Sequence, residues 1–246
     1  MRTLVAALAC RANGTRLYGK PLQLLDVDGS LSVLEYMVSM LRTEPSISDV
    51  VFGVSVGTAN DMFPEIAASL GVTSIRGDER DVLQRLIQCG DAVSASDILR
   101  VTTESPFTYV EAIAEVWERH TANANDVTVV DGLPDGCNFE IFTLEALRRS
   151  HARGDTRHRS ELCSLYIREH RDEFRVEVVP VPEALRRGDL RLTIDYPEDL
   201  ILCRRVYDRL KVHAPRIPLD RVIALLDAEP ELRALVAPHV TPTRLY

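Results

Sequence analysis

The segment TLVAALACRANGTRLYGKP, residues 3–21, joins a strand-like run to a basic loop. Thr3–Ala9 form a continuous apolar run, which is typical of a strand covered on both faces of a parallel sheet. The loop that follows holds two glycines and the cations Arg11, Arg16 and Lys20. Because ligands of open parallel sheets bind beyond the carboxyl ends of the strands, this loop is a candidate anion site. A triphosphate, with about four negative charges, suits a loop of cations and backbone N–H groups.

Short β-rich runs alternate with amphipathic helical runs after this segment. We expect strands at Val50–Val54, Val72–Ile75, Ile98–Thr102 and Val127–Val130, and helices from about Ser32, at Asp61–Leu70, at Asp81–Gln88 and at Phe107–His120. Ser32 is a good helix N-cap and Gly71 a suitable residue to end a helix. The alternation predicts an α/β fold, a three-layer sandwich in which helices cover both sides of a mostly parallel, Rossmann-like sheet.

The pattern loosens after Asp131. We expect strands at Phe139–Phe142, Val176–Val181 and Leu192–Ile194, helices at Leu144–His151, Glu161–Glu169 and Glu198–Leu210, and one or two further helices in the tail. The prolines that follow residue 210 suggest a boundary. We therefore predict one domain over residues 1–210 and a C-terminal helical extension over 211–246.

Composition limits the classes of function. The net charge of -8 and a pI near 5.3 argue against a general nucleic-acid surface. The five cysteines form no CxxC pair, which favours reduced thiols and a cytoplasmic protein, and none has zinc-ligand spacing with histidine. No apolar run approaches the length of a membrane span. The basic run 148–171 is either a solvated helical face or an acceptor-binding surface.

The basic loop has a rival interpretation. Gly14 to Lys20 fits GxxxxGK, the pattern of a phosphate-binding P-loop, but the next residue is Pro21. The hydroxyl that would bind magnesium is therefore missing, and the dinucleotide pattern GxGxxG is absent as well. A second alternative is a basic surface loop with structural glycines only.

Five motifs in order make the chain recognisable. Residues 11–21, RANGTRLYGKP, resemble the signature R-x-x-S/G-x-R-L-P-G-K of sugar-activating cytidylyltransferases, the group that includes CMP-Kdo synthetases and SpsF-type spore-coat polysaccharide proteins. The other matches are RGD at 76–78 with DVL at 81–83, LRVTTESP at 99–106, Gly136 with Glu140, and RLTIDYPEDL at 191–200. The resemblance covers roughly residues 1–210.

The resemblance implies a nucleotide-diphospho-sugar transferase fold that moves CMP from CTP to a small acceptor and releases pyrophosphate. The acceptor would be anionic: an acidic sugar, a sugar phosphate, or another phosphate or phosphonate. Residues 132–190 would serve acceptor binding and dimerisation, and the protein would be a cytoplasmic homodimer of polysaccharide biosynthesis with neither nucleic acid nor membrane as partner. A different nucleotide, or a non-catalytic binding protein, remain the alternatives.

The resemblance also assigns the nucleotide site. The cations Arg11, Arg16 and Lys20 would hold the CTP phosphates. Backbone and hydroxyl groups of the same loop would assist them, and a second segment would lie near the nucleotide: Ala12, Asn13, Gly14 and Thr15, with Arg76, Gly77 and Asp81. Asp81 alternatively only caps its helix.

Mg²⁺ is the implied cofactor, held by two carboxylates that correspond here to Glu104 and Asp195. Both follow expected strands, so both would reach one sheet edge, and Mg²⁺ suits a few carboxylates plus phosphate oxygens. Glu104 stands where the family has aspartate, which extends the carboxylate by about 1.5 Å. It is either a ligand, directly or through water, or a strand-end carboxylate paired with an arginine. Asp195 is alternatively only a turn residue before the helix at 198–210.

The acceptor half departs from the family pattern. Where relatives often have R-E-H-V-T-P-Y-I, residues 160–167 are SELCSLYI, so an arginine and a histidine are missing. Arg157, His158 and Arg159 are candidate replacement cations, which predicts an unusual acceptor.

Overall fold

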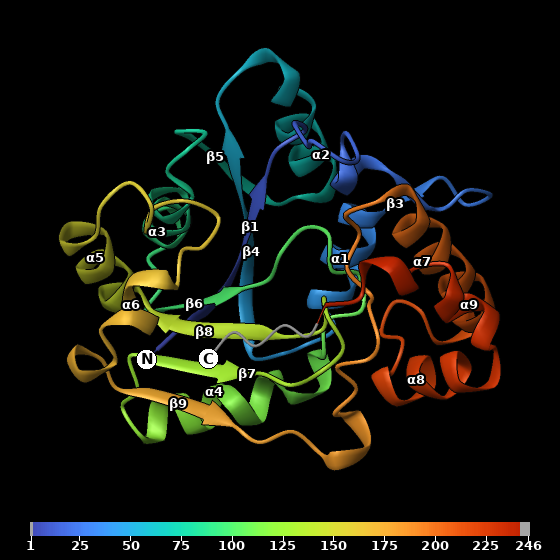
Figure 1. Ribbon diagram of the computed structural model, residues 1–246. Helices are drawn as coiled ribbons and strands as arrows, with labels where there is room; N and C mark the ends of the chain where they lie inside the picture. Colours follow the sequence, from blue (N-terminus) through green and yellow to red (C-terminus); the bar gives the residue numbers. More distant parts are fainter. Residues whose placement is uncertain (1, 242–246) are drawn as a thin grey trace.

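The computed structural model describes residues 2–241, so Met1 and 242–246, the ends of the two predicted domains, lie outside the described residues. Within residues 2–241, seven strands form the central sheet in the order β5-β4-β1-β6-β8-β7-β9 (Figure 1). Only β8 runs antiparallel to its neighbours in this sheet. The strands are β1 Leu4–Cys10, β4 Ile47–Ser55, β5 Thr73–Gly77, β6 Asp97–Arg100, β7 Val127–Val130, β8 Phe139–Thr143 and β9 Val176–Val179; β2 Leu24–Asp26 and β3 Leu31–Ser32 pair separately.

Helices cover both faces of this sheet. Alternate residues of β1 enter opposite cores, since Leu4 and Leu8 pack on one face whereas Val5 and Ala7 pack on the other. The first core is closed by α1 Val33–Leu41, α2 Met62–Leu70, α4 Ile113–Ala122, α7 Pro197–Leu210, α8 Leu219–Ala228 and α9 Pro230–Ala234; the second by α3 Val82–Ala92, α5 Leu144–Arg153 and α6 Leu165–Glu169. The three-layer α/β sandwich predicted from the sequence is therefore confirmed.

Local helix signals match the structure well. Ser32 caps α1 through a capping box with Glu35, and α2 ends at Gly71 in the left-handed conformation with φ 61°. The expected helix over 161–169 is shorter, because α6 begins only at Leu165.

The predicted strand Leu192–Ile194 is wrong as a sheet strand. Leu192 N donates to the Asp135 carbonyl at 2.7 Å, and Ile194 N donates to the Glu104 carbonyl at 2.9 Å. The segment thus bridges two different loops instead of pairing along one strand, and only an isolated bridge between Asp135 and Arg191 is formed. This crossing brings the following residue, Asp195, beside the loop after β6.

One or two helices were expected in the C-terminal extension, and it carries two, α8 and α9. Leu219, Val222 and Leu226 of α8 belong to the core that lines one face of the main sheet. The extension therefore packs as part of the same structure, and Figure 1 shows it beside α7. None of the helices within residues 2–241 is both long and apolar enough to cross a membrane.

Asp97, at the amino end of β6, is a fully buried carboxylate. It accepts hydrogen bonds from Arg2 Nε at 2.8 Å and from Trp117 Nε1 at 3.2 Å, and His120 Nε2 lies 3.5 Å away. Burial acts to raise the pKa of Asp97, but these donors outweigh it and lower the pKa to about 2. The network lies at the end of the sheet opposite to the carboxyl edge.

We expect Asp97 to make folding acid-sensitive. A carboxyl pKa that is lowered on folding stabilises the protein above the unfolded value near 4, and this stabilisation disappears as the pH falls through about 2. Asp97→Asn should lower the free energy of unfolding at pH 7 by about 2 kcal/mol and flatten its dependence between about pH 4 and pH 2. Urea unfolding at several pH values measures both, with exposed Asp172→Asn as the control. Equal acid profiles for the wild type and Asp97→Asn would contradict the assignment.

Candidate active site

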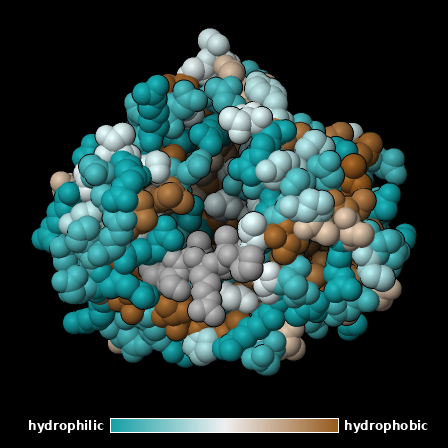
Figure 2. Space-filling model, viewed as in Figure 1, coloured by the Kyte–Doolittle hydropathy of each residue, from teal (hydrophilic) through white to brown (hydrophobic). Residues whose placement is uncertain are grey.

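A cleft of about 710 Å³ opens at the carboxyl edge of the parallel strands β1 and β6. Figure 2 shows the hollow near the centre of this face. Its walls come from the first loop, the end of β6 and the loop after it, the start of α3, and residues near 161 and 195. The lining residues are Ala7, Ala9, Arg11, Ala12, Asn13, Gly14, Thr15, Arg16, Leu17, Tyr18, Lys20, Pro21, Glu79, Val82, Arg85, Leu86, Arg100, Val101, Thr102, Thr103, Glu104, Glu161, Leu162 and Asp195.

The first loop is folded tightly enough to require its glycines. Gly19 N donates to the Ala12 carbonyl at 2.8 Å, and Gly19 has φ 60°, a left-handed conformation that favours glycine. A Cβ atom at Gly14 would lie 2.3 Å from the Leu17 carbonyl oxygen. Asn60 Oδ1 accepts from Ala12 N at 2.8 Å and ties the loop to the end of β4. All seven predicted positions of the loop, residues 11–16 and Lys20, line the cleft.

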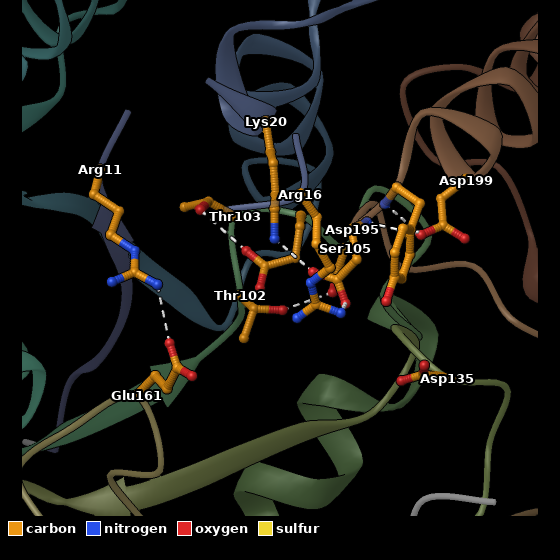
Figure 3. A network of polar contacts seen from close by, with 12 residues as sticks. Arg11, Arg16, Lys20, Thr102, Thr103, Ser105, Asp135, Glu161, Asp195 and Asp199 are labelled. Carbon is orange, nitrogen blue, oxygen red and sulfur yellow. Dashed lines mark hydrogen bonds and ion pairs between the residues drawn. The ribbon is translucent and has the colours of Figure 1, made fainter. Parts of the chain in front are cut away.

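The cations of the loop point across the cleft to carboxylates. Lys20 Nζ donates to Asp195 Oδ1 at 2.5 Å, and Arg16 Nη1 lies 3.6 Å from Asp195 Oδ2 (Figure 3). Arg11 Nη2 donates to Glu161 Oε2 at 3.0 Å on the other side. Three cations thus line one cavity, and each lies beside a carboxylate of the same cavity. An anionic ligand in the cavity would take the place of these carboxylates as the partner of the cations.

The two predicted metal ligands are brought together. A backbone hydrogen bond from Ile194 N to the Glu104 carbonyl joins the two segments that carry Glu104 and Asp195. The side chains of both carboxylates line the cleft. Burial raises the pKa of Glu104, and the charge of Asp195 raises it further, against the opposing charges of Lys20 and Arg100. Burial also acts to raise the pKa of Asp195, but the hydrogen bonds from Lys20 and Arg191 and the charge of Arg16 lower it overall. Asp195 is therefore the firmly ionised member of the pair.

Arg191 and Asp199 support Asp195 from behind. Arg191 Nε donates to Asp199 Oδ1 at 2.8 Å, while its Nη2 lies 3.1 Å from Asp195 Oδ2. Asp199 Oδ2 accepts the backbone N–H groups of Asp195 at 2.8 Å and Tyr196 at 2.9 Å. This role of Arg191 and Asp199 was not predicted from the sequence, although both residues stand in the motif RLTIDYPEDL at 191–200.

Comparison of the sequence with known proteins identifies the family of the chain. A family model described as cytidylyltransferase matches residues 5–229. The chain belongs to the cytidylyltransferase family. It is thus a nucleotidyltransferase enzyme, and the resemblance found in the sequence is confirmed.

Two curated relatives of this cytidylyltransferase cover nearly the whole chain. It is 28% identical over 94% of its length to an uncharacterized protein of Methanocaldococcus jannaschii, MJ1063, of which 93% is covered. It is also 28% identical over 94% of its length to the spore coat polysaccharide biosynthesis protein SpsF of Bacillus subtilis strain 168, of which 97% is covered.

Solved structures share the fold. A cytidylyltransferase from Leptospira borgpetersenii superimposes with a TM-score of 0.86 at 20% identity, covering 94% of this chain and 97% of that one. A CMP:2-keto-3-deoxy-manno-octonic acid synthetase solved with CTP has a TM-score of 0.66 at 11% identity, covering 84% of this chain and 99% of that one.

The second predicted nucleotide segment does not reach the cleft with the residues we expected. Arg76 pairs with Asp61 at 2.6 Å, and Asp81 caps α3 and contacts His151 at 2.7 Å, which is the alternative left open for Asp81. A Cβ atom at Gly77 would lie 2.5 Å from Gln88 Oε1, so this glycine permits close packing of β5 on α3. The segment contributes Glu79, Val82, Arg85 and Leu86 to the cleft instead.

Arg85 is a further cleft residue that was not predicted from the sequence. Its side chain is buried, and Nη1 donates to the Gly53 carbonyl at 2.8 Å and to the Cys10 carbonyl at 3.3 Å. Burial lowers the pKa of Arg85. The guanidinium therefore links the carboxyl ends of β1 and β4 below the loop, and only the helix pattern of α3 hinted that this residue faces inward.

The candidate replacement cations of the acceptor half face away from the cleft. Arg157 and His158 both contact Glu169, at 2.9 and 3.0 Å, and Arg159 donates to the carbonyl of His151 at 3.1 Å. On this side the cleft is lined by Arg100, Glu161 and Leu162. Arg100 is itself paired with buried Glu140 at 2.6 Å.

The carboxylates of the cleft fit magnesium. Within the part of the chain that the structure describes, no group of three or more His, Cys, Asp or Glu side chains forms a complete protein cage. Mg²⁺ usually takes one or two carboxylates and completes its shell with phosphate oxygens and water. Glu104 and Asp195, which line the same cleft as the basic loop, match that donor set.

Proposed function

We propose that this cytidylyltransferase transfers CMP from CTP to a small, sugar-like acceptor and releases pyrophosphate in a magnesium-dependent reaction. The observation that carries the proposal is the meeting of Glu104 and Asp195 with a glycine-containing basic loop in one cleft. Family membership supports the nucleotide, and the pair of carboxylates supports the metal.

The chain's own residues would perform three tasks. Arg11, Arg16 and Lys20 would bind the triphosphate, and they are already placed by their contacts with carboxylates of the same cleft. Backbone N–H groups of the tight loop would approach the phosphates closely at Gly14. Glu104 and Asp195 would hold Mg²⁺, which neutralises phosphate charge and assists attack of the acceptor oxygen on the α-phosphorus.

Ligand binding would change the ion-pair partners of Lys20 and Arg16 without a large rearrangement of the cleft. In the free protein Asp195 faces Lys20 and Arg16, so these cations shield the carboxylate. Arrival of a triphosphate with its counterion would give each cation a phosphate oxygen and leave Asp195 for the metal. We therefore expect nucleotide and metal to bind together more tightly than either binds alone.

The acceptor is proposed by similarity to proteins whose names refer to polysaccharide biosynthesis and to a keto sugar acid. An anionic acceptor remains our prediction, with Arg100, which lines the cleft and donates to the Glu161 carbonyl, as the candidate cation for it. The homodimer and the cytoplasmic location also remain predictions. The alternative of a non-catalytic scaffold was based on the replacement of aspartate by Glu104. That replacement no longer supports it, because Glu104 lines the cleft together with Asp195 despite its extra methylene group.

Pyrophosphate release with each of the four nucleoside triphosphates, Mg²⁺ and a panel of acidic, phosphorylated and neutral sugars tests the proposal. We expect CTP to be preferred and chelation of Mg²⁺ to stop release. Lys20→Met should raise KM for CTP about 10- to 100-fold, since a charge-assisted hydrogen bond contributes roughly 1.5–3 kcal/mol.

Lys211→Met is the matched control, because Lys211 is exposed, lies outside the cleft lining and pairs with Asp208 at 3.3 Å. Its KM should equal that of the wild type. Preference for another triphosphate would change the nucleotide of the proposal, and turnover that is unaffected by chelation would contradict the metal.

A further inference from the structure

The last described turn of the C-terminal extension contacts the residue that follows Asp195 of the cleft. The short helix η7, Ala237–His239, places the His239 ring on the Tyr196 ring, with centroids 3.8 Å apart and planes 5° from parallel. The His239 side chain is 24% exposed, and its Nε2 lies 3.8 Å from Glu198 Oε2. Tyr196 directly follows Asp195, so the extension contacts the turn that carries the ionised carboxylate of the cleft.

The same tyrosine restrains a cation of the first loop. The Arg16 guanidinium lies over the Tyr196 ring at 5.0 Å from its centroid. Arg16 is otherwise loosely held, because its side chain is 47% exposed and its approach to Asp195 is 3.6 Å. A long, exposed side chain loses rotamer freedom on binding a ligand unless a neighbour already orders it. Tyr196 is the neighbour placed to do this.

Core packing fixes the position of the stacking histidine. Leu226, Leu232 and Val236 are buried in the core shared with the main sheet. Arg187 Nη1 donates to Asp227 Oδ2 at 2.7 Å and clamps α8 to the body of the enzyme. The turn at His239 follows directly from this anchored segment, so its ring can act as a fixed support for Tyr196.

We propose that His239 is a positioning residue that orders Arg16 for triphosphate binding through the Tyr196 ring. The C-terminal extension is then a working part of the cleft rather than an appendage. This inference rests on the proposed function for the nature of the anion, although the chain of contacts from His239 to Arg16 does not depend on it. Stacking, not the charge or the hydrogen bonding of the imidazole, carries the effect.

Four variants and two probes test the inference: His239→Ala, His239→Phe, Arg16→Met and the double variant His239→Ala/Arg16→Met, each titrated with CTP plus Mg²⁺ and with inorganic tripolyphosphate. We expect His239→Ala to raise Kd for both probes about 3- to 10-fold. His239→Phe, which keeps a stacking ring, should stay within about twofold of the wild type. Arg16→Met should weaken binding, and adding His239→Ala should then change nothing further.

His213→Ala is the control, since His213 is exposed in the same extension and lies outside the cleft lining. A wild-type Kd in His239→Ala, even with a lower melting temperature, would overturn the inference. So would an equal loss on adding His239→Ala to Arg16→Met, because the two residues would then act independently. A wild-type protein that binds tripolyphosphate but not CTP would contradict only the proposed function. A wild-type protein that binds neither probe would overturn both the proposed function and this inference.

Discussion

Replacing Asp195 with asparagine is expected to lower kcat for pyrophosphate release by about 10³-fold, while Kd for CTP rises by less than about tenfold. Asparagine keeps the shape of the side chain and a hydrogen-bond acceptor but removes the charge that Lys20, Arg16 and Arg191 surround. In the proposed site, loss of one of the two carboxylates that would hold the metal should act mainly on the transition state, in which phosphate charge develops. The loop cations should remain in place and still bind the triphosphate.

Steady-state kinetics and direct titration with CTP separate the two effects. Asp61→Asn is the matched control, because Asp61 is also paired with an arginine but lies outside the cleft lining. It should leave kcat unchanged. A kcat for Asp195→Asn within tenfold of the wild type would remove Asp195 from the metal site and leave it as a turn residue.

Glu104 belongs to the same experiment. If Glu104 and Asp195 share one metal, Glu104→Gln should also lower kcat strongly, and the double variant should lose far less than the product of the two single losses. Independent losses would mean that Glu104 serves another role in the cleft. This comparison decides whether the longer carboxylate at position 104 replaces the family's aspartate.

The features predicted correctly from the sequence are the local ones. A continuous apolar run specifies β1, the serine at 32 specifies the start of α1, and glycine and basic residues specify the first loop, because each signal acts within a few residues. The position of this loop in the cleft was also predictable, because a loop that follows a central parallel strand lies at the carboxyl edge of the sheet, where ligands bind.

The features that differ from the expectations depend on contacts between distant segments. Residues 192–194 look like a strand, yet their N–H groups bond to two separate loops, which no periodicity reveals. Arg76 and Asp81 match a motif but point to Asp61 and His151, because the side-chain partners on neighbouring helices decide their direction. The contacts of Arg85 could not be predicted either, because its hydrogen-bond acceptors are backbone carbonyl groups of β1 and β4.

Asp199→Asn is expected to lower both stability and turnover. Asp199 is 1% exposed and binds Arg191, itself 6% exposed, through two nitrogen–oxygen contacts at 2.8 and 2.9 Å. Removing one partner of a buried ion pair costs about 3 kcal/mol or more, even with Asp135 still beside Arg191 at 2.7 Å. For a chain of this size that corresponds to a fall in melting temperature of roughly 10 °C. Asp91→Asn, which breaks an exposed pair with Arg148, should cost less than about 1 kcal/mol.

The loss of turnover should exceed what instability explains. Asp199 holds the backbone N–H groups of Asp195 and Tyr196, so its loss lets the turn shift, and a displacement of about 1 Å in a catalytic group can cost about 10²-fold in rate. Asp97→Asn provides the comparison, because it removes a buried carboxylate at the opposite end of the sheet, away from the cleft. At a temperature where both variants are folded, kcat should fall at least tenfold in Asp199→Asn and stay near the wild-type value in Asp97→Asn. Equal kcat values would show that Asp199 only stabilises the fold, and that Asp195 keeps its position without it.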